Sequence, residues 1–182
     1  MTSSPGGAPE FSRPFDVRQV EGKQPHLEAD EAERAALAVR FGLVRIDALS
    51  ADLDLSRKDG PAGAEVEARG TLRARIVQSC AVSAEDLPVT VEEPLFLRFV
   101  PKGAVTYVPD EEIELDADAC DEIEYAGIHV DLGEAVAQSL ALAIDPFLTG
   151  PDADLARKTA GIGMPEDQSP FAALKGLKLG GE

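Results

Sequence analysis

The sequence predicts an α+β protein with one antiparallel β-sheet, open or barrel-like, two packed helices and a flexible C-terminal tail. Two stretches, 30–42 and 131–144, begin with helix-start signals and carry apolar residues on one face, which predicts the helices. Three long stretches between 43 and 99 alternate apolar and polar residues, as strands with one buried face do. Hydrophobic residues make up 44% of the 182 residues, which is enough for one core.

The chain divides into a single domain with extensions at both ends. Residues 1–10 are rich in Ser, Pro and Gly without an apolar anchor, so we expect disorder there. Residues 11–148 form the single α+β domain, and Pro14 restricts its opening strand to a sheet edge. Residues 149–182 are expected to be a linker and tail, with a short helix near 169–179.

The first helix has signals at both of its ends. Asp30 followed by Glu33 matches a capping box, in which each side chain accepts a hydrogen bond from the backbone amide of the other residue. Gly42 is the expected stop, since glycine readily adopts the left-handed backbone conformation that ends helices.

The strand-forming stretches also predict their irregularities. In 43–55 the alternation changes phase by one residue, which indicates a β-bulge near Asp47–Leu49. The Gly- and Pro-containing sequence 58–63 predicts the turn into the next strand. Pro94 marks an edge or a break in the third stretch, because proline cannot donate to a strand ladder.

Polarity and charge together predict how the second and third stretches pair. If they form a hairpin with matching apolar faces, Arg73 lies opposite Glu92 and Glu67 lies opposite Arg98. Each such cross-strand pair of opposite charges adds roughly 0.2–1 kcal/mol to stability.

The second helix follows one or two short strands within 123–130. Asp131 and Glu134 repeat the capping pattern, and Asp145–Pro146 ends the helix. Its apolar residues extend around much of the surface, so we expect it to be buried against the sheet.

The overall charge excludes some partners and favours others. Seventeen basic and 34 acidic residues give a formal net charge of −17, and the segment 110–124 holds nine acids and no base. Such a surface repels phosphate backbones and anionic membranes and favours a basic partner. The N-terminus does not have the pattern of a signal peptide, and two cysteines suit a reducing compartment, so we expect a cytoplasmic location and no membrane contact.

No motif singles out a catalytic, metal or cofactor site. His26 and His129 lack the spacing of a metal-binding pair, and Gly-rich phosphate loops and Gly-x-Ser-x-Gly are absent. Cys80 and Cys120 are too few for a zinc site, and the acidic run departs from the EF-hand pattern. We therefore expect no enzyme activity, no metal and no cofactor.

Two groups of residues are candidate interfaces. One is the apolar side of the tail helix, which either fills a groove on a partner or docks on its own domain; it consists of Phe171, Leu174 and Leu177. The other is a set of arginines on the polar face of the hairpin, which either contact RNA phosphates or pair with neighbouring glutamates. These arginines are Arg69, Arg73, Arg75 and Arg98.

Three motifs in the right order resemble the YceD family. Val77-Gln-Ser-Cys80, followed by the strand 88–91, resembles its strand-end motif ECxRC. The stretch 128–146, with Leu140-Ala-Leu-Ala-Ile144, looks like its IDL…LALP helix. Ser169-Pro-Phe-Ala-Ala-Leu-Lys175 resembles its terminal PFAxL signature. The resemblance covers about 43–177.

This resemblance implies a cytoplasmic bacterial factor, related also to plastid proteins, that is needed for normal 23S ribosomal RNA levels. It implies no known enzymatic activity. Many members carry a Cys-x-x-Cys and a further cysteine after the last helix, whereas Ser83 stands at the second position here and 145–150 has no cysteine. A metal site of those members is therefore not carried over, and Cys80 is assigned no role.

We expect a non-enzymatic factor that supports 23S rRNA accumulation and large-subunit assembly by contacting a basic ribosomal or assembly protein. Direct RNA binding through the four hairpin arginines is one alternative, with 23S rRNA as the partner. A β-barrel that binds a small molecule is another, since a long alternating sheet can enclose a ligand.

Overall fold

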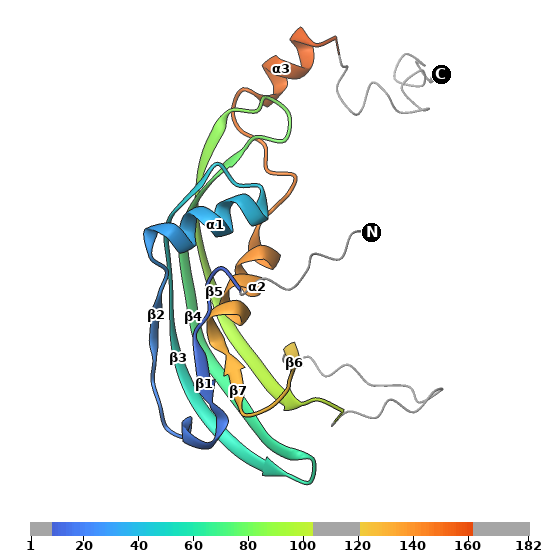
Figure 1. The fold of residues 1–182 in the computed structure, drawn as a ribbon. Helices are drawn as coiled ribbons and strands as arrows, with labels where there is room; N and C mark the ends of the chain where they lie inside the picture. Colours follow the sequence, from blue (N-terminus) through green and yellow to red (C-terminus); the bar gives the residue numbers. More distant parts are fainter. Residues whose placement is uncertain (1–8, 104–120, 162–182) are drawn as a thin grey trace, which may run out of the picture.

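The structure is a computed structural model that describes residues 9–103 and 121–161. Its dominant feature is a long, curved sheet in the strand order β2-β3-β4-β5-β6 (Figure 1). Three long antiparallel strands form its centre: β3 (Arg45–Gly60), β4 (Gly63–Ser79) and β5 (Asp86–Pro101). The short strands β2 (His26–Glu28) and β6 (Asp121–Tyr125) lie at its two edges, and β6 runs parallel to β5.

Most of the remaining elements cover one face of this sheet (Figure 1). The strands β1 (Pro14–Asp16) and β7 (His129–Asp131) pair as a separate two-stranded ribbon, and the 3-10 turn η1 (Val17–Gln19) follows β1. The helices α1 (Glu31–Phe41) and α2 (Leu132–Ala143) complete the layer. Buried side chains of the sheet, such as Leu49, Leu72 and Leu97, face this layer and form the core with it. The α+β class is therefore confirmed.

The sheet does not close into a barrel. Its edge strands β2 and β6 are not paired with each other, so the described sheet is open. The barrel-like form is therefore wrong, and the alternative of a small molecule enclosed in a barrel loses its basis. The physical reason is that α1, α2 and the β1–β7 ribbon supply the apolar surface that the concave face needs for burial, and closure would leave no room for them.

The hairpin register is confirmed. Arg73 lies opposite Glu92, and Glu67 lies opposite Arg98. The predicted bulge is also present, as a register shift between Ile46 and Ala48.

Pro94 occupies an edge rather than a break. It sits in the unbroken ladder with β4, opposite Thr71. Within the described sheet, β6 pairs with β5 only from Leu97 to Pro101, so the other side of Pro94 has no neighbouring strand. Successive backbone amides along a strand point to opposite edges. Pro88 lies six residues before Pro94, an even number, so both positions face the same edge of β5. Both prolines therefore lack a donor on that edge of β5.

The helix caps follow the sequence. Asp30 and Glu33 form the full capping box of α1, and Gly42 ends the helix in the left-handed conformation, with a φ of 67°. The Asp131 side chain accepts a hydrogen bond from the amide of Glu134 and so caps α2. These local signals placed both helix starts correctly.

The N-terminal segment is fastened to the helix layer by polar contacts. Asp131 accepts hydrogen bonds from the Arg13 amide (2.8 Å) and the Ser12 hydroxyl (2.6 Å). The Arg40 guanidinium bridges Glu134 (2.8 Å) and Glu10 (2.9 Å), and these carboxylates raise its pKa.

Close packing accompanies these polar contacts. Phe11 is completely buried. A Cβ atom on Gly133 would lie 2.3 Å from the Phe11 carbonyl oxygen, so the first turn of α2 needs glycine to approach this segment.

Some elements were not predicted, and some predictions lie outside the described residues. The strand β2 and the helix α3 (Ala153–Thr159) were missed, and α3 lies inside the predicted linker. The tail helix near 169–179, with Phe171, Leu174 and Leu177, falls outside the described residues, as do residues 1–8 and 104–120. Predictions about those segments stay predictions.

Candidate functional site

The four hairpin arginines lie on the face of the sheet that is turned away from the helices. Arg69, Arg73 and Arg75 are exposed on alternate residues of β4, and Arg98 is half-buried on β5. The sequence therefore predicted correctly that these side chains share a face.

Most of these arginines already have acidic partners. Arg73 forms ion pairs with Asp52 (2.9 Å) and Glu92 (3.3 Å). Arg98 pairs with Glu122. His26, and after it Arg73, hold the pKa of Asp52 below its usual value by hydrogen bonding to the carboxylate. Carboxylates thus neutralise this part of the face and reduce its attraction for phosphate.

Arg69 and Arg75 differ from the other two. Arg69 stacks on the Phe96 ring, 3.7 Å from its centroid, and also contacts Glu67 at 3.3 Å. Arg75 forms no ion pair with any residue that the structure describes. The candidate RNA surface is therefore one stacked and one unpaired arginine rather than a continuous basic patch.

A second notable site surrounds Cys80, where β4 ends. The turn after this strand wraps the thiol sulfur, which accepts hydrogen bonds from the amides of Val82 (3.5 Å) and Ser83 (3.3 Å). The Gly150 amide, from the segment after α2, donates a third at 3.3 Å. Cys80 is buried, with 4% of its surface exposed. The segment after α2 is thereby attached to the β4–β5 turn.

These donors favour the thiolate. Hydrogen bonding from Ser83, followed by the Gly150 amide, lowers the pKa of Cys80 to about 7. Sequence analysis assigned this residue no role, because hydrogen bonds from backbone amides leave no signal in a residue pattern.

The stability that Cys80 contributes is expected to depend on pH. Its folded pKa is about 7, below the ordinary value of 9.0, so the stabilisation is complete above about pH 9 and disappears as the pH falls through about 7. The difference in unfolding free energy between the natural chain and the Cys80→Ser variant should therefore grow between these two pH values. Urea denaturation across this range measures it, and a difference that does not vary with pH would contradict the assignment.

A metal site does not fit around this thiol. Ser83 stands where a second thiolate would be needed, and Gly150 offers only a backbone amide. Within 9–103 and 121–161, no three His, Cys, Asp or Glu side chains gather closely enough to hold a metal ion. Structural zinc needs about four such ligands.

Several large apolar side chains are exposed around the segment that follows α2. They include Leu142 and Phe147, each 80% exposed, and Leu155 on α3 at 65%.

None of the helices in the described part of the chain has the length and apolarity needed to cross a membrane.

The fold and these surfaces define an open-sheet α+β protein with one helix-covered face, one exposed charged face and a cysteine-centred turn at its end. The chain belongs to the YceD family: residues 68–178 match the family described as Large ribosomal RNA subunit accumulation protein YceD. This membership confirms the resemblance and connects the chain with accumulation of the large ribosomal RNA subunit. Comparisons with curated proteins gave no match, and neither did comparisons with solved structures.

Proposed function

We propose that this chain supports 23S rRNA accumulation and large-subunit assembly, in the cytoplasm and without catalysing a reaction, by binding a basic ribosomal or assembly protein. The observation that carries the proposal is the charge pairing on the exposed sheet face. Its arginines are largely paired with carboxylates, while the chain as a whole has a net charge of −17. A surface of this kind attracts a cationic protein more strongly than a phosphate backbone.

Electrostatic complementarity would act mainly on the rate and specificity of association. Acidic residues that form no ion pair within the described residues, such as Glu31 on α1 and Glu124 on β6, are exposed on the described surface. Opposite charges on a ribosomal protein would raise the association rate and disfavour wrong partners.

Direct RNA contact is the second candidate, and one observation favours it. Arg69 stacked on Phe96 is a cation next to an aromatic ring, a combination that accepts an unpaired base. Arg75 on the same strand would add a phosphate contact. This candidate predicts crosslinks from β4 to 23S rRNA, and a salt dependence that weakens with each Arg→Ala substitution.

One co-sedimentation experiment separates the two candidates. The tagged full-length chain is mixed with large-subunit precursor particles, or with their protein fraction after RNase treatment. We expect association to survive RNase and to weaken by at least about tenfold between about 0.05 M and about 0.5 M salt, because charge complementarity is screened. Association that RNase abolishes would support the RNA candidate instead, and association that is insensitive to salt would contradict the charge mechanism.

A further inference from the structure

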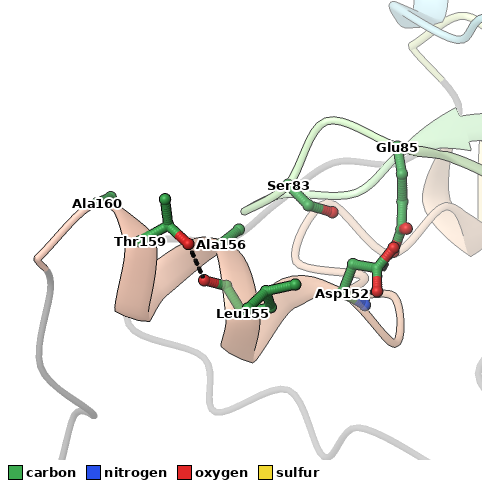
Figure 2. A pocket seen from close by; sticks show the side chains of 7 residues that line it. All are labelled: Ser83, Glu85, Asp152, Leu155, Ala156, Thr159 and Ala160. Carbon is green, nitrogen blue, oxygen red and sulfur yellow. Dashed lines mark hydrogen bonds between the residues drawn. The ribbon is translucent and has the colours of Figure 1, made fainter.

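An open groove lies between the β4–β5 turn and α3. Its volume is about 540 Å³. Figure 2 shows Ser83 from the turn on one side and the side chains of Leu155 and Ala156 from α3 on the other. Leu155 is 65% exposed here. The groove therefore offers one apolar wall, on α3, without an apolar occupant among the described residues.

One end of this groove is acidic. Figure 2 shows Glu85 and Asp152 together at that end, with Thr159 and Ala160 at the opposite end. The Asp152 amide donates to the Glu85 carboxylate at 3.4 Å, so the two residues are held side by side. Within the described parts of the chain, no Lys or Arg forms an ion pair with either carboxylate. This contrasts with the exposed sheet face, where arginines neutralise the carboxylates.

The geometry of the groove is fixed by tight packing behind it. A Cβ atom on Gly150 would lie 1.8 Å from the Glu85 carboxylate and 2.7 Å from Leu87, so the chain before α3 passes directly against the turn. Ala153, the first residue of α3, is buried with 4% exposure. The two walls are therefore attached to each other, which makes the groove a preformed feature.

We propose that this groove docks a lysine- or arginine-bearing segment of the basic protein partner. The aliphatic part of such a side chain packs along Leu155 and Ala156, and its charged end reaches Glu85 and Asp152. The same carboxylates repel RNA phosphates, so a nucleic acid does not suit the groove. This inference rests on the proposed function and names the surface through which it acts.

A peptide titration followed by NMR tests the proposal on the full chain. The probe is acetyl-Ala-Lys-Leu-Ala-Arg-Leu-Ala-amide, and its neutral analogue carries Gln in place of Lys and Arg. We expect the basic peptide to shift the amide signals of Ser83, Glu85 and Ala156, and the neutral analogue to bind at least about tenfold more weakly.

Charge-neutralising variants sharpen this test. Glu85→Gln with Asp152→Asn removes both negative charges but keeps the shape of the side chains. The side-chain oxygen of the new Gln can still accept the hydrogen bond from the backbone amide of residue 152. The Asp152 side chain makes no cap hydrogen bond that the substitution would remove. We expect this double variant to bind the basic peptide at least about tenfold more weakly than the natural chain. The matched control, Glu28→Gln with Glu93→Gln, changes the net charge equally at exposed positions outside the groove and should bind within about twofold of it.

Three outcomes would overturn the proposal. The first is equal binding of the basic and neutral peptides, and the second is equal loss of binding in the double variant and its control. The third concerns the variant with Lys175→Gln and Lys178→Gln, measured without any peptide. If the NMR amide signals of the groove residues change in this variant, the groove binds the tail of this chain. If the peptide test fails while association with precursor particles survives RNase, the groove assignment alone is wrong and the proposed function stands.

Discussion

Replacing Asp131 with alanine is expected to lower the free energy of unfolding by about 3 kcal/mol. One carboxylate oxygen accepts from the amides of Arg13 (2.8 Å) and Glu134 (3.1 Å), and the other accepts from the Ser12 hydroxyl (2.6 Å). Alanine removes the cap of α2 and leaves the donors of the N-terminal segment unpaired in a half-buried position. Urea denaturation at constant pH measures the loss.

Two milder variants show whether hydrogen bonding is the cause. Asp131→Asn keeps an acceptor for both amides, and its amide group can donate to Ser12, so we expect a loss of only about 1 kcal/mol. Ser12→Ala removes one bond and should also cost about 1 kcal/mol. An Asn variant as unstable as the Ala variant would show that the charge, rather than the hydrogen bonds, holds this corner together.

The contacts of Asp131 join a segment inside the family match to a segment before it. The match covers residues 68–178, whereas the contacts of Asp131 reach back to Ser12 and Arg13. The pairing of β1 with β7 and the complete burial of Phe11 make the same connection. The segment before residue 68 is therefore an integral part of this fold, and loss of its anchor should destabilise the whole domain.

Signals that act over a few residues made much of the fold predictable. The capping box at Asp30 and the phase change near Asp47 depend only on neighbouring residues, and both appear where they were expected. The register of Arg73 with Glu92 was also predictable, because apolar alternation and opposite charges agreed on one alignment.

Features that depend on distant contacts were not predictable from the pattern. The strand β2 is only three residues long, too short for a recognisable alternation, and exists because its backbone pairs with β3. The helix α3 lies in a Gly-, Pro- and Asp-rich stretch that reads as a linker, yet Ala153 is buried and the Gly150 amide just before it donates to Cys80. Closure of the sheet depends on what covers its concave face, which the alternation of a single strand does not reveal.

The candidate sites also combine features that sequence predicted with features that it missed. Sequence placed Arg69, Arg73, Arg75 and Arg98 on one face, but the partner Asp52 comes from a third strand, β3, which the hairpin pattern did not consider. The groove was missed entirely, because Glu85 and Asp152 are 67 residues apart and neither belongs to a motif. A turn and, far along the chain, an acidic residue at a helix start are both common features, so neither one indicates a groove.

Replacing Phe171, Leu174 and Leu177 together with serine is expected to weaken association with large-subunit precursor particles by at least about tenfold. Their spacing predicts one apolar side of a helix in 169–179, a segment outside the described residues. Burying even one or two such side chains in a partner groove contributes more than about 1.4 kcal/mol, which is a factor of ten in affinity. Co-sedimentation of the full-length variant measures this effect. Substitution is preferable to a cut after Gly150, because that cut would remove the buried Ala153.

The control for this prediction must remove exposed apolar surface elsewhere. Val39→Ser with Leu142→Ser does so, since these side chains are 84% and 80% exposed. This control should associate within about twofold of the natural chain, because exposed side chains outside an interface contribute little. If the tail variant sediments with particles as well as the natural chain does, the tail is not an anchor. If its free energy of unfolding falls instead, the three residues dock on their own domain, which is the other arrangement that their spacing allows.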